Sequence, residues 1–256
     1  MNLESDLPAL DARRFLTTHW TVVLRAAQSQ APGASSALAQ MCRLYWYPLY
    51  AFVRYRGYNP DDAQDLTQGF FLHLLDRRAL TRVDPLKGKF RTFLLVSLQN
   101  FLATEAERAR CLKRGGKMEF IPWDTQSAEE RYRLEPADYL TGEKIFDARW
   151  AMTMLAEAMK RLEEDYAFQG KAATFEALKA FLDPLNSKSP PSYEQAAAAL
   201  GVSLSAGKTL IHRLRKQFTS FLREEVACTV SDPAEVDDEI RALCEALIAS
   251  EGRLNP

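Results

Sequence analysis

Apolar residues recur every three or four positions along nearly the whole chain, and no stretch of four to eight residues alternates between apolar and polar. This spacing is typical of amphipathic helices rather than of strands. Glycine and proline, which interrupt helices, lie between the periodic segments. The sequence therefore predicts an all-α fold, with a first helix that starts at 17 or 18 and further helices over about 35–56, 60–76, 89–113, 143–166, 172–182, 192–200, 203–225 and 233–250.

Two local signals refine this assignment. Pro48 falls inside the second helix, where a proline removes a backbone donor, so we expect a kink or a restart there. The third helix follows the turn Gly57-Tyr58-Asn59-Pro60, and Asn59 or the aspartates after it can cap the helix. The apolar stripe predicted for this helix consists of Ala63, Leu66, Phe70 and Leu74.

The length of 256 residues suits about two domains. A mixed, proline-containing and highly charged stretch separates two groups of helices, and we take it as a linker. The predicted segments are an N-terminal extension with a helix (1–34), a first helical domain (35–117), the linker (118–142), a second helical domain (143–225) and an acidic C-terminal helix (226–256).

Composition narrows the class of protein. Hydrophobic residues make up 47% of the chain and charged residues 26%, which indicates a folded chain rather than a disordered one. The 33 basic and 34 acidic residues give a net charge of −1, so any contact with nucleic acid must come from a local basic face. No apolar run reaches the roughly 18 residues of a membrane span. The first ten residues carry acids where a signal peptide carries cations, so we expect a cytoplasmic protein without membrane contact.

The chain has four cysteines and three histidines, and none of them stands at the spacing of zinc ligands. We therefore expect neither a metal site, nor a disulfide framework, nor a cofactor.

The most specific motif is a helix-turn-helix around Gly201. An alanine-rich helix precedes this glycine, which can take a positive φ at the turn, and an amphipathic helix follows it. Between 205 and 223 there are five cations and no carboxylate, so this face can bind phosphates and base edges; the alternative is a solvated face of an ordinary hairpin. Leu210, Ile211, Leu214 and Phe218 are predicted to point inward. The expected DNA-contacting face comprises Ser205, Lys208, Thr209, His212, Arg213 and Lys216, with Arg215 to its side.

A second basic stretch, 87–117, holds eight cations against two glutamates. Phenylalanines and the amides Gln99 and Asn100 are interleaved with these cations. Such a mixture suits single-stranded bases, through stacking and edge hydrogen bonds. The alternative for each phenylalanine is a place in the core, which is what aromatics at helical spacing usually occupy.

Three ordered blocks in the first domain resemble region 2 of extracytoplasmic-function (ECF) sigma factors, and the helix-turn-helix resembles their region 4. The blocks are LYWYPLYAFV (44–53), DDAQDLTQGFF (61–71) and GKFRTFL (88–94), followed by Asn100. The segments outside this two-domain core resemble an extended subgroup with extra N- and C-terminal segments. The resemblance implies a region 2-like helical bundle joined by a linker to a region 4-like domain.

The resemblance also implies a promoter-specificity subunit rather than an enzyme. Its partners would be core RNA polymerase, through the β′ and β subunits, and promoter DNA at the nucleoid. The residues that would bind the polymerase are Asp61, Asp62, Asp65 and Gln68. Those that would bind the −10 element are Lys87, Lys89, Phe90, Arg91, Asn100 and Arg108. The outward face of the helix-turn-helix would read the −35 element.

The chain departs from the family pattern in two places. The third helix has Gln64 and Gly69 where the pattern has acids, and Thr67 lies on the same helix. A phosphate on Thr67 would add about −1.5 to −2 charges, which makes a Ser/Thr kinase a candidate regulator beside an anti-sigma factor. The C-terminal segment is strongly acidic. It can act as a lid on the basic face 208–216, or as a solubilising helix packed on the second domain.

Two other functions are open. A stand-alone helix-turn-helix regulator would bind duplex operators without polymerase, but it would leave the aromatic and Asn100 block unexplained. A metal-dependent nuclease would have to use Asp61, Asp62, Asp65 or Asp84. Three of these aspartates lie within five residues at one helix start, where acids favoured by the helix dipole are expected, rather than converging from separate segments.

Overall fold

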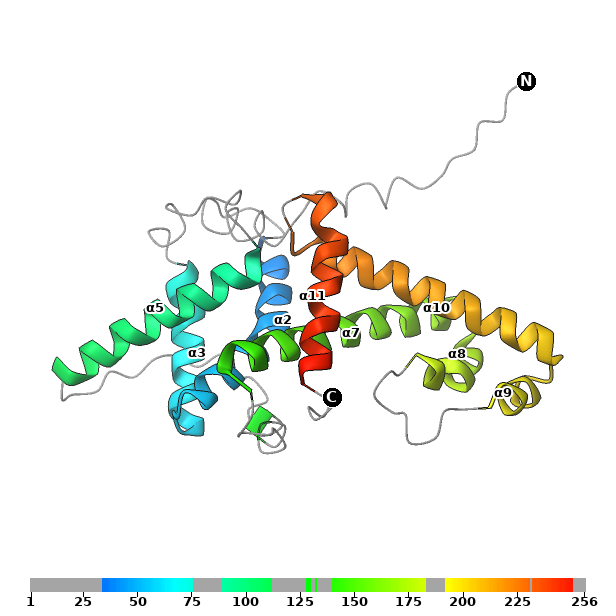
Figure 1. Cartoon of the computed structure of the whole chain (residues 1–256), viewed down its shortest axis with the longest axis horizontal. Coiled ribbons are helices and arrows are strands. Elements are labelled where there is room, and N and C mark those ends of the chain that lie inside the picture. The colour runs from blue at the N-terminus through cyan, green and yellow to red at the C-terminus, as the bar shows by residue number, and fades with distance from the viewer. Residues whose placement is uncertain are drawn as a thin grey trace, which may run out of the picture. The chain divides into compact units, whose positions relative to one another are not determined.

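The structure, a computed structural model, describes residues 34–75, 89–111, 128–129, 132, 140–182, 192–230 and 232–250. Within these ranges the chain is helical and contains no strand (Figure 1), as the apolar spacing predicts. The helix expected to start at 17 or 18 lies outside the described residues. The elements are α2 (Ala34–Tyr55), α3 (Pro60–Leu75), α5 (Phe90–Cys111), α7 (Gly142–Phe168), α8 (Ala172–Leu178), the 3-10 helix η3 (Lys179–Phe181), α9 (Tyr193–Ala199), α10 (Leu204–Ala227), the 3-10 helix η4 (Pro233–Glu235) and α11 (Val236–Ala249).

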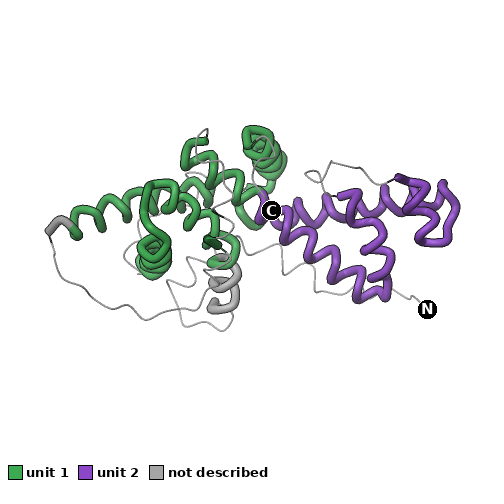
Figure 2. The backbone as a smooth tube through the Cα atoms, turned by 90° about the horizontal axis from the view of Figure 1, so that it is seen from below, with its two compact units in different colours: residues 1–151, 227–256 green, residues 152–226 purple. Residues whose placement is uncertain are grey.

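The chain divides into two compact units (Figure 2). Unit 1 comprises residues 1–151 and 227–256, and unit 2 comprises residues 152–226. One boundary therefore falls inside α7 and the other at the C-terminal end of α10. This division by compactness differs from the predicted segments, because residues 143–151 and the acidic C-terminal helix both group with unit 1.

Helix α2 supplies much of the core of unit 1. Every residue from 44 to 53 is buried, which explains why this stretch is apolar around its whole circumference. Tyr45 meets Phe90 edge-to-face with 5.4 Å between ring centroids, and Trp46 stacks on Tyr50 at 5.1 Å. Burying one such side chain stabilises the fold by about 1.5–3 kcal/mol. The helix runs through Pro48 without interruption, so the predicted restart does not occur.

Helix α3 begins where the turn residues predict. Gly57 has a φ of +91° in the turn before the helix. Asn59 is the capping residue, because its side-chain Oδ1 accepts a hydrogen bond from the Asp62 amide at 2.8 Å. The buried stripe of the helix differs by one position from the prediction, since Thr67 is buried and Leu66 is only partly so. The buried side chains at helical spacing are Ala63, Thr67, Phe70 and Leu74.

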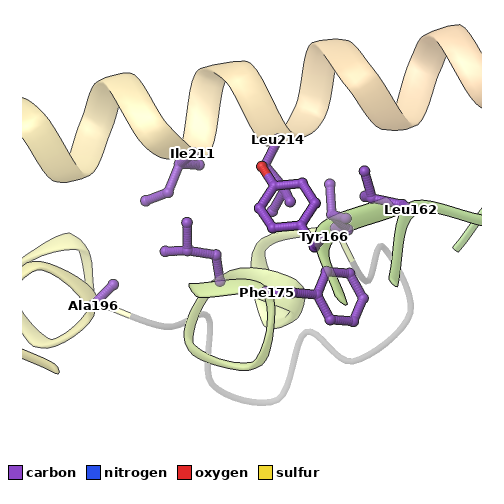
Figure 3. Close-up of a cluster of buried hydrophobic side chains, with 8 residues drawn as sticks. Leu162, Tyr166, Phe175, Ala196, Ile211 and Leu214 are labelled. Atoms are coloured by element: carbon purple, nitrogen blue, oxygen red, sulfur yellow. The ribbon is translucent and has the colours of Figure 1, made fainter. Parts of the chain in front are cut away.

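Unit 2 is built around one apolar cluster (Figure 3). Ile211 and Leu214 point from α10 toward residues of α7 and α8, where Tyr166 and Phe175 lie with ring centroids 5.9 Å apart. Leu210 and Phe218 pack on the cluster while partly buried, so the predicted inward face of α10 is confirmed. The buried members of the cluster are Leu162, Tyr166, Phe175, Leu178, Leu182, Ala196, Ile211 and Leu214.

An ion-pair network joins α7 to α10 within unit 2. The Arg161 guanidinium donates to Glu224 Oε2 at 2.7 Å and to Glu225 Oε1 at 2.6 Å, and it lies 4.7 Å from the centre of the Phe221 ring. Burial tends to lower the pKa of Arg161, but the bonds to the two carboxylates outweigh it and raise the pKa. These contacts stabilise the C-terminal part of α10, away from the helix-turn-helix.

Candidate nucleic-acid interface

The helix-turn-helix is formed by α9, the turn 200–203 and α10. The Ser192 hydroxyl accepts from the Glu194 amide at 3.2 Å and caps α9, and the Ser203 hydroxyl accepts from the Ala206 amide at 3.3 Å at the start of α10. Gly201 lies between them with a φ of +64°, as predicted for the turn. The two caps mark where each helix begins, and this glycine lies in the turn between them.

Small residues let the two helices cross closely. Ala196 and Ala197 are the buried residues of α9, and Gly207 is buried on α10. A Cβ added to Gly207 would lie 3.1 Å from the Ala197 Cβ, which is tighter than most contacts between such atoms. Packing therefore requires small residues at 196 and 197, whereas Ala198 and Ala199 are exposed.

The outward face of α10 carries all six residues predicted to contact the −35 element. They stand at steps of three and four residues, and this spacing places them on one side of the helix. Each of them is exposed: Ser205, Lys208, Thr209, His212, Arg213 and Lys216. The structure thus brings these residues together on an open surface with no carboxylate between 205 and 223.

Contacts within unit 2 position one cation of this face, Lys208, and one beside it, Arg215. The Lys208 ammonium lies 5.9 Å from the centre of the Tyr193 ring. The hydrogen bond from the Ser192 hydroxyl, aided by a backbone amide and by the charge of Lys208, lowers the pKa of Glu194. The Arg215 guanidinium donates twice to the Phe181 carbonyl oxygen at 3.3 Å, so this cation is held at the side of the face.

The residues predicted to bind the −10 element differ in their exposure to solvent. Phe90 has no exposed surface and packs on Tyr45, so its ring cannot stack on a base and its assignment to DNA is wrong. Asn100 is exposed on α5. Arg108 is exposed as well, and it pairs with Glu105 one turn away at 2.6 Å. Lys87 lies outside the described residues.

Lys89 and Arg91, also predicted for the −10 element, are already paired with carboxylates in unit 1. The Lys89 ammonium lies 2.5 Å from Glu239 Oε2, and Arg91 Nε donates to Glu239 Oε1 at 2.6 Å. Arg91 Nη1 also donates to Asp147, and its guanidinium lies 5.2 Å from the centre of the Trp150 ring. Burial raises the pKa of the Asp147 carboxyl, against the opposing effect of Arg91. Neither cation is an open phosphate site in this arrangement.

Of the four residues predicted to bind polymerase, three are exposed and one is buried. Asp61, Asp62 and Asp65 are exposed in the first half of α3, where acids are favoured by the helix dipole. Gln68 is buried, with 8% of its surface exposed. The predicted docking surface of α3 therefore loses Gln68 and consists of the three aspartates.

Thr67 is not placed as a phosphorylation site. It has no exposed surface, and its hydroxyl donates to the Ala63 carbonyl oxygen at 2.7 Å. A kinase could reach it only after α3 had opened, and a phosphate with about −1.5 to −2 charges has no place in an apolar core. Phosphorylation of Thr67 therefore does not supply the negative charge that α3 lacks at Gln64 and Gly69 relative to the family pattern.

The acidic C-terminal helix, α11, also departs from prediction. It groups with unit 1 rather than with the second helical domain, and its buried carboxylate, Glu239, pairs with Lys89 and Arg91 of the same unit. Glu239 and Asp147 are not among the site residues predicted from the sequence. A signal for Glu239 is present, because Val236, Glu239 and Leu243 share the helical spacing of a buried stripe.

Comparison with known protein families, curated proteins and solved structures finds no match to this chain. Within the described ranges, no helix has the length and apolar character that crossing a membrane requires. The same part of the chain brings no three His, Cys, Asp or Glu side chains together in a group that could hold a metal ion. Asp84, which the nuclease hypothesis invokes, lies outside the described residues.

Proposed function

We propose that this chain is a promoter-recognition subunit of bacterial RNA polymerase, of the ECF sigma type, acting in the cytoplasm. In this proposal the α2–α3–α5 part of unit 1 corresponds to sigma region 2 and unit 2 corresponds to region 4. The observation that carries the proposal is the outward face of α10, where six polar or basic side chains are exposed on one side of a capped helix-turn-helix.

This face has the properties that duplex DNA requires. Lys208, Arg213 and Lys216 are exposed along the helix, and such cations can neutralise phosphates on either side of the major groove. Ser205, Thr209 and His212 supply hydrogen-bonding groups between them, which can reach base edges. We assign recognition of the −35 element to this face.

The sequence blocks in unit 1 favour a polymerase subunit over a general DNA-binding protein. They resemble sigma region 2, and the exposed Asp61, Asp62 and Asp65 offer an acidic surface to a cationic coiled coil of the β′ subunit. For the −10 element we retain Lys89, Arg91, Asn100 and Arg108 as candidates and omit Phe90, because it is a core residue.

A second candidate function is a stand-alone regulator that binds duplex operators. The observation that favours it is the pairing of Lys89 and Arg91 with Glu239, which leaves fewer cations on α5 for single-stranded DNA. In this case α10 would do all of the DNA binding.

The test is co-elution of the purified chain with core bacterial RNA polymerase in size-exclusion chromatography. We expect the wild-type chain to co-elute, and Asp65→Lys to lose binding because it reverses a charge on the proposed docking surface. Glu163→Lys, which makes the same change at an exposed position of α7, is the matched control and should still co-elute. If no variant co-elutes while the chain binds duplex DNA, the stand-alone regulator replaces the sigma proposal.

A further inference from the structure

Glu239 is an unusual residue for an acidic surface helix, because its carboxylate is buried. Only 1% of its side chain is exposed, and it lies on the inner stripe of α11 between Val236 and Leu243. A buried carboxylate is costly unless cations and hydrogen bonds compensate it. Lys89 and Arg91, which approach its two oxygens at 2.5 and 2.6 Å, supply that compensation.

The cations around Glu239 have the chemistry of a phosphate site. An arginine and a lysine that each contact one oxygen of an anion can bind a nucleic-acid phosphate in the same way. Arg91 is also held from two other sides, by Asp147 and by the face of the Trp150 ring. Its guanidinium therefore stays oriented when Glu239 is removed, and it does not have to be ordered by an incoming ligand.

We propose that α11 is an internal competitor of nucleic acid, in which Glu239 occupies the position of a backbone phosphate at Lys89 and Arg91. The helix must leave this site before single-stranded DNA can bind there. This inference rests on the proposed function, since it concerns the regulation of the −10 binding surface.

The construction of α11 suits a helix that can be displaced. Three of its fourteen residues are buried, namely Val236, Glu239 and Leu243. Its outer face exposes Asp238 and Glu245. The buried apolar residues are Val236 and Leu243, and the partly buried ones are Ile240, Ala242, Ala246 and Leu247. The paired charges of Glu239 are the polar part of this attachment, which an anionic competitor has to replace. The affinity of the site is then reduced by the fraction of time for which α11 covers it.

The first experiment compares the binding of a fluorescein-labelled, mixed-sequence single-stranded DNA to full-length variants by anisotropy. Glu239→Gln keeps the side-chain volume and removes the charge, and we expect it to raise the affinity about tenfold over wild type. Glu245→Gln makes the same charge change on the exposed face of α11 and should bind as wild type does. Adding Arg91→Ala to Glu239→Gln should abolish the gain. Equal affinities for Glu239→Gln and Glu245→Gln would overturn the proposal.

The second experiment uses the unaltered chain, so that it does not depend on how well a variant folds. Hydrogen exchange of the α11 amides is measured with and without saturating single-stranded DNA. Displacement predicts that 236–249 lose protection when DNA is bound, while the amides of α10 do not. Unchanged protection of α11 with bound DNA would contradict the proposal, as would failure of both wild type and Glu239→Gln to bind single-stranded DNA.

These outcomes are independent of the polymerase test. If the chain fails to co-elute with core polymerase but Glu239→Gln still increases DNA affinity, the sigma proposal fails and the competitor remains. If the chain co-elutes but the α11 amides stay protected from hydrogen exchange when DNA is bound, the proposal that α11 competes with DNA fails and the sigma proposal remains.

Discussion

The two groups of cations predicted to bind DNA have opposite surroundings in the structure. On α10 the side chains stand on an open face, and the neighbouring contacts hold cations such as Arg215 at its side. At the start of α5, Lys89 and Arg91 are turned toward carboxylates from α7 and α11. The residue types are the same in both places. What differs is whether distant parts of the chain bring acids to them, so charge in the local sequence does not by itself predict an available binding site.

Substitutions in the two groups of cations should differ most in their effect on the free energy of unfolding. Arg91→Ala leaves Glu239 and Asp147 without their main partner, and breaking a buried pair costs about 3–5 kcal/mol. Arg213→Ala removes an exposed side chain and should change the free energy of unfolding by less than about 0.5 kcal/mol. Urea denaturation followed by far-UV circular dichroism is suitable, because both units are helical and both contribute to the signal. Similar losses in both variants would mean that the Arg91 network is not structural.

The next effect concerns binding to duplex DNA. Arg213→Ala should lower the affinity for a −35-type duplex about tenfold and reduce the dependence of the binding constant on salt by about one ion. Arg215→Ala is the matched control, because this neighbouring arginine is tied to the Phe181 carbonyl oxygen at the side of the face. Anisotropy titrations at several salt concentrations give both quantities. If Arg215→Ala proved the more damaging change, the face assigned to DNA would be wrong.

The smallest effect lies at the cap that begins the helix-turn-helix. Ser192→Ala removes the side-chain acceptor for the Glu194 amide and should cost about 1 kcal/mol at pH 7.

The same substitution changes the dependence on pH. The Ser192 hydroxyl lowers the pKa of Glu194, so this carboxylate contributes stability above its unfolded pKa, and that contribution is lost as the pH falls through the folded value. Thermal unfolding between pH 3 and 7 should therefore show a flatter acid dependence for Ser192→Ala. An unchanged slope would show that the hydroxyl does not set this pKa.

Sequence reasoning was reliable where the signal is local. Asn59, Gly201 and Ser192 mark helix ends through their own hydrogen bonds or φ angles, and a helix begins or ends within two residues of each position. The helix-turn-helix face is local for the same reason, because one helix of known spacing determines which side chains point out.

The errors arose where the partner is distant in the chain. Phe90 is buried because Tyr45 lies across from it, and Thr67 takes the place of Leu66 in a buried stripe whose other members, Ala63, Phe70 and Leu74, are as predicted. Glu239 pairs with Arg91 across 148 positions of sequence. Helical periodicity tells which residues share a face, but it does not tell which other element covers that face.

The order of the two units along the chain has a consequence for synthesis. Unit 2 is one continuous stretch, 152–226, and its contacts can form once that stretch has left the ribosome. Unit 1 is discontinuous, because Thr229, Val230 and α11 follow unit 2 in the chain but belong to unit 1. Until they arrive, Arg91 lacks the carboxylate of Glu239. The nascent protein therefore passes through a period in which Lys89 and Arg91 lack this partner, and translation of α11 ends it.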